Sequence, residues 1–221
     1  MSDSAADEIL AILRAEASPR NVEGMARFGI GAKKAYGVGV TRLRKIAKPY
    51  ARDKKLAAAL WKEGSLEAKI LASLLDDPAT LTEAAAERYL KGFENWAVTD
   101  AFCLNLFDRA AWAYAKPAPW SEREDEQQKR AAFALMAGLA WHDKEAEDAR
   151  FAPFFALCER EAGDPRNYVK KGVSWALRQM GKRGDPALRK KALASAKRLA
   201  AREETSARWI ARDVAKELAP H

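Results

Sequence analysis

The chain has 221 residues, 48% of them apolar, and its 39 basic and 31 acidic side chains give a formal net charge of +8. That length can bury a sizeable core in one domain or one extended array, and the charge favours a polyanionic partner, most simply nucleic acid. With two cysteines outside any CxxC pair, two histidines, no long apolar run and no basic leader, we expect no zinc site, no membrane span and no signal peptide.

Helix-forming residues dominate the chain, and no convincing alternating strand pattern is present. We therefore predict an all-α protein. Asp or Gly-Asp before proline, as in Gly184-Asp185-Pro186, marks a turn followed by a new helix. The predicted helices cover residues 5–16, 20–28, 41–50, 53–62, 66–76, 80–91, 96–108, 124–142, 147–161, 166–181, 186–202 and 205–218.

Two longer stretches are predicted to lack regular structure. Lys116–Ser121 (KPAPWS) is expected to cross the surface. Gly29–Val40 contains Tyr36-Gly37-Val38-Gly39, but it lacks the GxxxxGK[ST] pattern whose backbone N–H groups surround a phosphate. A nucleotide-binding loop is therefore a poor interpretation of this stretch.

Helix pairs recur roughly every 30–40 residues without strict sequence identity, as in a degenerate helical solenoid. A compact helical bundle is the alternative, but a solenoid better accommodates about a dozen short helices with brief links. We therefore predict one repeat domain over residues 1–221.

The helix predicted over 96–108 is the most informative one. Asn95 is its expected N-cap, and Trp96 and Asp100, four residues apart, share one face. Because an unpaired carboxylate is rarely left in apolar surroundings, this pair suggests a site for a cation or a developing positive charge. The alternatives stay open: Trp96 packs in the core, and Asp100 is an acid near a helix start that pairs with an arginine. Cys103 and Phe107 continue the shared face, and the opposite side is formed by Val98, Phe102 and Leu106.

The helix predicted over 166–181 has a core side and a cationic side at about 100° per residue. The core side consists of Val169, Val173, Ala176 and Met180. The cationic side consists of Tyr168, Lys171, Trp175, Arg178 and Lys182. A basic stripe with aromatics suits contacts with phosphate, sugar and base. The alternative is a solvated face with Trp175 partly covered by lysine stems.

Similar faces recur on other helices, which favours one continuous basic concave surface. In the helix predicted over 124–142, small residues share a face with two larger ones and could let a ligand approach closely. That face consists of Arg130, Ala134, Ala137 and Trp141. In the last helix Arg208, Trp209, Arg212 and Lys216 oppose Ile210, Val214 and Leu218. Further charge comes from Arg42, Arg44, Lys45 and Lys48, for which a solvated helix is an equally good explanation.

Five segments between Gly24 and Arg183 resemble, in order, the sequence blocks of the DNA alkylation repair family of AlkD-like DNA glycosylases. GMARFGIGAKKAYGVGVTRLRKIAK is similar to the opening block, and WKEGSLEAKILASLLDD resembles the next one, with Glu67 at its glutamate. ENWAVTDAFCLNLF resembles the block ending in Trp-x-x-x-Asp. KRAAFALMAGLAWHDK resembles the block whose arginine precedes small apolar residues, and RNYVKKGVSWALRQMGKR the Lys-Ala-x-x-Trp-Ala-Leu-Arg block.

This resemblance implies a right-handed superhelical solenoid of HEAT-like antiparallel helix pairs with a basic, DNA-binding concave face. It implies that Asp100 and Trp96 are catalytic and that Arg130 and Trp175 lie at the lesion site. The cationic side chains of the 166–181 helix would add DNA contacts, and these are Tyr168, Lys171, Arg178 and Lys182. The chain departs from the family pattern at Ala97 and Thr99, and at Gly172, where alanine is commoner.

The expected activity is that of a monofunctional glycosylase that hydrolyses the N-glycosidic bond of positively charged N3- or N7-alkylated purines. The expected partner is double-stranded DNA, with no metal and no organic cofactor. We expect a monomer in the cytoplasm, at the nucleoid when bound to DNA. The sequence gives no sign of a pocket for a flipped base. The alternatives are a non-catalytic relative that binds bent or branched DNA and a helical-repeat scaffold.

Overall fold

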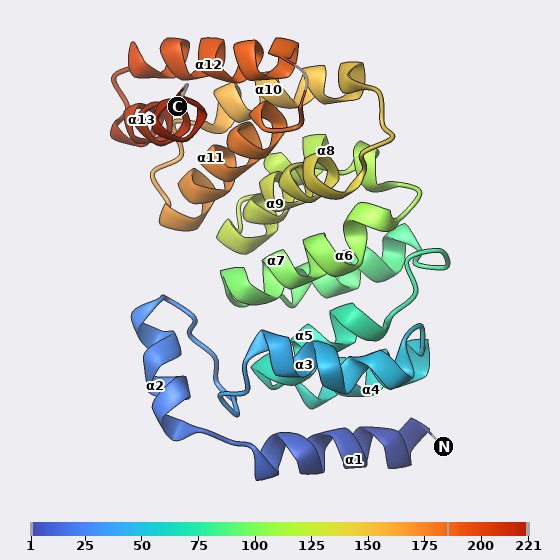
Figure 1. Ribbon diagram of the computed structural model, residues 1–221. Coiled ribbons are helices and arrows are strands. Elements are labelled where there is room, and N and C mark those ends of the chain that lie inside the picture. Colours follow the sequence, from blue (N-terminus) through green and yellow to red (C-terminus); the bar gives the residue numbers. More distant parts are fainter. Residues whose placement is uncertain (1, 185, 220–221) are drawn as a thin grey trace. The chain divides into compact units, whose positions relative to one another are not determined.

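The computed structural model describes residues 2–184 and 186–219, so Asp185 of the predicted turn and His221 lie outside these ranges. Within them the chain contains helices and turns and no strand (Figure 1). The prediction of an all-α protein is confirmed. The chain divides into two compact units, one ending at Ala110 and the other beginning at Ala111. The handedness of the array and the single domain remain predictions.

The first unit consists of α1 (Ser2–Ala15), α2 (Pro19–Arg27), α3 (Val40–Ala47), η1 (Lys48–Tyr50), α4 (Lys54–Glu63), α5 (Leu66–Leu75), α6 (Glu83–Lys91), α7 (Trp96–Asn105) and η2 (Phe107–Arg109). The helix α5 packs between α3 and α7, and α4 packs on α5 and α1. The turn between α4 and α5 needs Gly64, which ends α4 at a φ of 84°, a left-handed conformation that glycine adopts without steric cost.

Aromatic side chains hold α4, α6 and α7 together in the core of this unit. The Phe102 ring of α7 lies 5.2 Å from the Trp61 ring of α4 and 4.7 Å from the Tyr89 ring of α6. Phe93 and Phe107 complete the cluster. Large aromatic side chains dominate core energetics, so this cluster fixes the axis of α7 and with it the residues on its other face.

The second unit consists of η3 (Ala113–Ala115), α8 (Pro117–Ser121), α9 (Glu126–His142), η4 (Asp148–Phe151), α10 (Ala152–Glu161), α11 (Asn167–Gly181), α12 (Pro186–Ala200) and α13 (Thr205–Leu218). Here α11 packs between α9 and α13, while α8, α10 and α12 cover the other side of these helices. The sequence prediction for Lys116–Ser121 was wrong. Pro117 stands at the first position of α8, where proline is tolerated, and Trp120 is fully buried.

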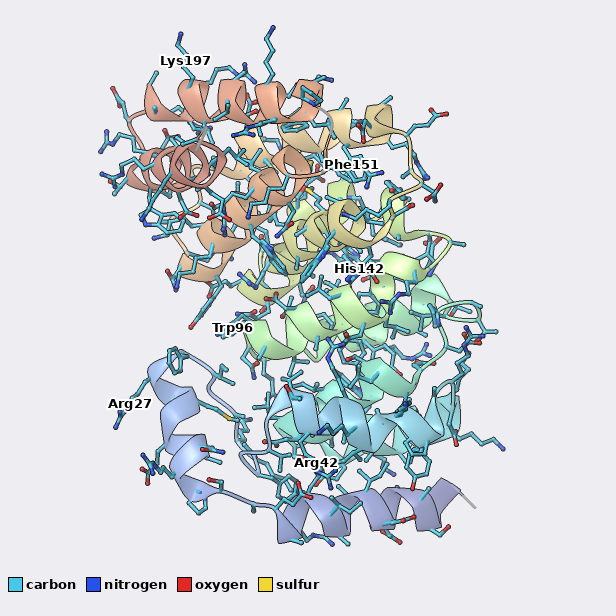
Figure 2. All side chains as sticks on the ribbon, viewed as in Figure 1. Arg27, Arg42, Trp96, His142, Phe151 and Lys197 are labelled. Atoms are coloured by element: carbon cyan, nitrogen blue, oxygen red, sulfur yellow. The ribbon has the colours of Figure 1, made fainter. Side chains whose placement is uncertain are left out.

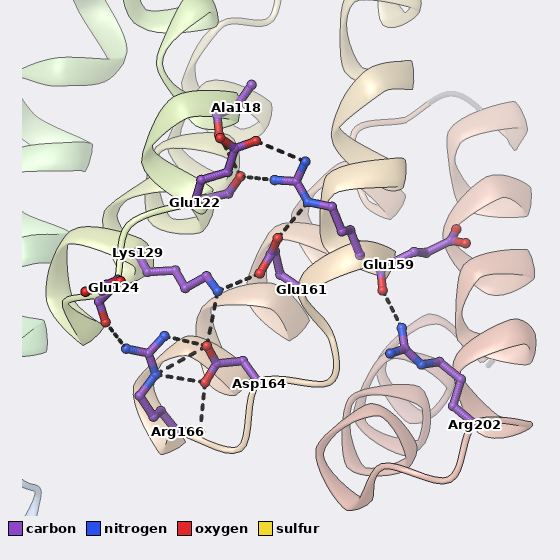
Figure 3. Close-up of polar contacts among 11 residues, drawn as sticks. Ala118, Glu122, Glu124, Lys129, Glu159, Glu161, Asp164, Arg166 and Arg202 are labelled. Atoms are coloured by element: carbon purple, nitrogen blue, oxygen red, sulfur yellow. Dashed lines mark hydrogen bonds and ion pairs between the residues drawn. The ribbon is translucent and has the colours of Figure 1, made fainter.

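A network of ion pairs joins the ends of α9, α10 and α11 (Figure 3). The Lys129 Nζ lies 2.5 Å from Glu161 Oε2 and 3.3 Å from Asp164 Oδ2. Burial would raise the pKa of Asp164, but hydrogen bonds from Arg166 and Lys129 hold it below its usual value. Because Lys129 is the residue before Arg130, the network fixes the register of α9 near the predicted site arginine.

No helix in the described ranges is long and apolar enough to cross a membrane.

Candidate functional site

The start of α7 is built as the sequence predicts. The Asn95 Oδ1 accepts hydrogen bonds from the backbone N–H groups of Ala97 and Val98, at 3.1 and 3.2 Å. The Nδ2 of the same side chain donates to Gly31 O at 3.2 Å. Asn95 therefore caps α7 and also ties it to the segment that follows α2.

Trp96 and Asp100 are both half-buried and lie on one face of α7. The Trp96 Nε1–H donates to Phe28 O at the end of α2, at 3.0 Å, which leaves the indole faces rather than its polar edge available for contacts. Figure 2 shows Trp96 at the first turn of α7. Further along, Cys103 and Phe107 are fully buried, so the open part of this face ends at the turn after Asp100.

Trp96 and Asp100 line a cavity of roughly 320 Å³ within the first unit. Its wall is mostly aliphatic, with contributions from α2, α3, α5 and α7, including Met25, Ile30, Val38, Val40, Leu66, Ile70 and Leu104. Three polar residues, Arg44, Glu67 and Asn105, share the wall with Asp100. The Arg44 Nη2 donates to Asn105 Oδ1 at 3.3 Å. The size is within the range of small-molecule sites, and such a pocket was not expected from the sequence.

Glu67 holds the segment that closes this cavity. Its fully buried carboxylate accepts hydrogen bonds from three consecutive backbone N–H groups: Tyr36 at 2.9 Å, Gly37 at 2.7 Å and Val38 at 3.2 Å. Gly37 has a φ of 81°, and a Cβ there would lie 2.4 Å from Ser18 O, so glycine is required. The family resemblance singles out Glu67. Its hydrogen-bond partners lie in the loop between α2 and α3, some 30 residues earlier in the chain.

The two faces of α11 match the sequence prediction. Val169, Val173, Ala176 and Met180 are fully buried. On the other side, Lys171 and Lys182 are exposed, whereas Tyr168, Trp175 and Arg178 are half-buried. On α13, Ile210, Val214 and Leu218 are likewise buried, opposite exposed Arg208, Arg212 and Lys216.

Two cations of the α11 stripe are paired with carboxylates of α13. The Arg178 Nε lies 3.3 Å from Asp213 Oδ2, and Arg178 Nη1 lies 3.7 Å from Glu217 Oε2. Lys182 also pairs with Glu217. The sequence predicts that these side chains are open to a ligand, but in the structure a phosphate would have to displace the carboxylates. Asp213 and Glu217 are one helical turn apart and so reach the same neighbouring helix, but the local sequence does not show that this neighbour is α11.

Arg130 is more deeply placed than the other site residues, with 6% of its surface exposed. Its Nη1 donates to Tyr168 O at 2.7 Å and so joins α9 to the first turn of α11. At Gly172 a Cβ would lie 3.3 Å from Phe133 Cβ and 3.6 Å from Arg130 Cγ. Glycine in place of the commoner alanine therefore allows the close approach of these two helices.

The predicted ligand-contacting face of α9 is wrong in one respect. Ala134 and Ala137 are fully buried, so these small residues admit neighbouring helices and not a ligand. Only Trp141 on that face is open, with 51% of its surface exposed. The described residues include no group of three or more His, Cys, Asp or Glu side chains that could hold a metal ion.

The fold, together with Trp96 and Asp100 in the wall of one cavity, defines a helical-repeat protein with a carboxylate among mostly aliphatic side chains. The sequence profile of the DNA alkylation repair enzyme family matches residues 9–218, and the chain belongs to this family.

A solved structure described as "a new family of proteins related to the HEAT-like repeat DNA glycosylases with affinity for branched DNA structures" has the same fold. It is similar with a TM-score of 0.78 at 16% sequence identity, over 95% of this chain and 94% of that one. No curated protein sequence matches the chain. The HEAT-like repeat fold implied by the sequence resemblance is thereby confirmed.

Proposed function

We propose that this protein is a monofunctional DNA glycosylase that removes positively charged N3- or N7-alkylpurines from double-stranded DNA. The observation that carries this proposal is the placement of Asp100 beside Trp96 on one face of α7, in the wall of an aliphatic cavity. Membership of the DNA alkylation repair enzyme family supports the same conclusion. A carboxylate with aliphatic neighbours acts in a low-dielectric environment, where its field is stronger than in water.

The chemistry needs little more than this carboxylate. An alkylated purine is cationic, so when the C1′–N bond breaks the base takes the bonding electron pair and departs as a neutral molecule. The sugar left behind resembles an oxocarbenium ion, which Asp100 would stabilise. Water then attacks C1′, and Asp100 would orient this water and receive its proton. The faces of Trp96 would stack against cationic or C–H-rich groups of the lesion nucleotide.

The second unit would supply contacts with the DNA backbone. Lys171 is exposed and could contact a phosphate directly, whereas Arg178 and Lys182 would exchange their α13 carboxylates for phosphates. The bond from Arg130 to Tyr168 O supports a role in placing the first turn of α11 on the DNA backbone. No lysine is needed as a nucleophile, so base removal without strand cleavage is expected.

We expect the protein to release N7-methylguanine and N3-methyladenine from duplex DNA and to leave uracil in place. The physical reason is that Asp100 supplies negative charge but no acid for an anionic leaving base. The measurement is free base released from matched duplexes that differ only in the lesion. Release of uracil at a rate similar to the alkylpurines would contradict this mechanism.

A non-catalytic protein that binds branched DNA is the second candidate. The similar solved structure, with its described affinity for branched DNA, favours it. Such a protein would recognise DNA by shape and charge. Tight binding to a four-way junction, with no base released from any alkylated duplex, would decide for this candidate.

Replacing Lys171, Arg178 and Lys182 together by alanine should weaken binding to all duplexes to a similar degree. Each lost phosphate contact should reduce the slope of log K against log salt by about 0.9. Because two of these cations are paired with Asp213 and Glu217, the total reduction in slope should correspond to the loss of between about one and three phosphate contacts. The control replaces exposed Lys55, Lys62 and Lys91 by alanine, which changes the net charge equally. Identical slopes for the two variants would place the α11 stripe away from DNA.

A further inference from the structure

The helix α12 has the most one-sided charge of any helix in the second unit. Its sequence, PALRKKALASAKRLA, contains five basic residues and no acidic one. Its buried residues are Leu188, Ala192, Ser195, Ala196 and Leu199, which pack against α10, α11 and α13. At about 100° per residue, Lys190 and Lys197 lie on the side of the helix opposite this packing, while Lys191 and the two arginines flank the packed side. Surfaces of soluble proteins usually mix both signs of charge, so a helix face of one sign needs a reason.

The arginines and the lysines of α12 have different surroundings. Arg189 donates to Leu218 O at 2.7 Å, which fixes the end of α13. Arg198 pairs with Glu159 of α10 at 2.6 Å. By contrast, Lys190, Lys191 and Lys197 are exposed, and among residues 2–184 and 186–219 no ion pair is found for them. Figure 2 shows Lys197 directed away from the helix. The arginines stabilise the fold, whereas the three lysines make no contribution of this kind.

The three lysines have the spacing of a phosphate-binding surface. Lys190 and Lys197 are two helical turns apart on one face, or about 10.5 Å along the axis, and Lys191 projects from the flank of that face, about 100° around the helix from Lys190. One DNA strand presents a phosphate roughly every 3.4 Å along the duplex axis, so each lysine can meet a different phosphate. No aromatic side chain lies on α12, which favours backbone contacts over contacts with bases.

This surface is separate from the α11 stripe. The core side of α11 faces the layer that contains α10 and α12, and its stripe of Lys171, Trp175 and Arg178 faces the opposite way. Lys190 and Lys197 lie on the outer side of α12, opposite its buried residues, and Lys191 lies on the flank. A duplex bound along the α11 stripe therefore leaves the α12 lysines unoccupied.

We propose that Lys190, Lys191 and Lys197 bind the phosphate backbone of a second DNA duplex segment, so that one molecule holds two duplex arms. This inference rests on the DNA binding proposed above, and it assigns a surface that the glycosylase chemistry does not use. A protein with two duplex-binding surfaces prefers branched or crossing DNA to linear DNA. Once one arm of a branched DNA is bound, the second arm of the same DNA is at high effective concentration near the second surface.

The test replaces the three lysines by glutamine and compares this variant with the native protein on a four-way junction and on a short linear duplex. Three lost contacts should weaken junction binding at least about tenfold at 0.1 M salt, with little change for the linear duplex. With excess short duplex at low salt, sedimentation should show two duplexes per native molecule and one per variant. The matched control is Lys55→Gln, Lys62→Gln and Lys91→Gln in the first unit.

The outcomes separate this inference from the proposed glycosylase activity. The second duplex surface is rejected if the α12 variant and the control lose affinity for the junction and for the linear duplex by the same factor. It is also rejected if the native protein and the α12 variant bind the same number of duplexes per molecule. An acidic protein would then be the partner to examine. If the native protein releases no alkylated base but the α12 variant loses junction binding selectively, the glycosylase proposal fails and the second surface stands.

Discussion

The Asp100→Asn variant should bind DNA normally but release alkylated bases at least about one hundred times more slowly than the native protein. Loss of one preorganised electrostatic group at a transition state typically costs two to three orders of magnitude in rate. Asparagine keeps the size of the side chain and one of its two acceptor oxygens, so the half-buried site beside Trp96 should retain its shape. The measurement is single-turnover release of N7-methylguanine, together with the duplex Kd.

Asp7→Asn is the matched control, because it removes the same charge from an exposed position on α1 in the same unit. It should leave both the rate and the Kd unchanged. Release of base at a near-native rate by folded Asp100→Asn would remove Asp100 from the mechanism. Equal slowing in both variants would assign the effect to net charge rather than to the site.

The Glu67→Ala variant should lower the free energy of unfolding by about 3 kcal/mol or more. The substitution leaves the part-buried N–H of Tyr36 and the buried N–H groups of Gly37 and Val38 without their acceptor, and each buried unsatisfied group costs about 1–3 kcal/mol. Glu67→Gln should be intermediate, because one carbonyl oxygen remains to accept part of these bonds. Denaturant unfolding gives the free energies, and hydrogen exchange reports on the three amides directly.

Glu23→Ala, at an exposed position of α2 near the same segment, is the control and should have almost no effect. Slow exchange of the three amides in Glu67→Ala, together with native stability, would show that the loop is held by other contacts. Because this segment closes the cavity beside Asp100, loss of its amide protection should accompany slower base release. That link connects the stability of the loop to the proposed chemistry.

The sequence by itself was sufficient to predict most of the helices, apart from the short α8, and the buried faces of α11 and α13. The positions of Val169, Val173 and Met180 on the core side of α11 follow from helical periodicity, as does the Asn95 cap of α7. These features depend on residues within one or two turns of each other, and this local information can be read along the chain. The placement of Trp96 and Asp100 on one face was predictable for the same reason.

Only the tertiary structure decided how distant residues meet. The Glu67 carboxylate accepts hydrogen bonds from backbone N–H groups some 30 residues earlier in the chain. The carboxylates of Asp213 and Glu217 on α13 form ion pairs with Arg178 and Lys182 of the α11 stripe. The buried Ala134 and the short helix around Trp120 likewise depend on which elements pack around them. Helical periodicity shows which side of a helix is apolar. Which partners reach the polar side depends on contacts between helices far apart in the chain, and no local pattern encodes those contacts.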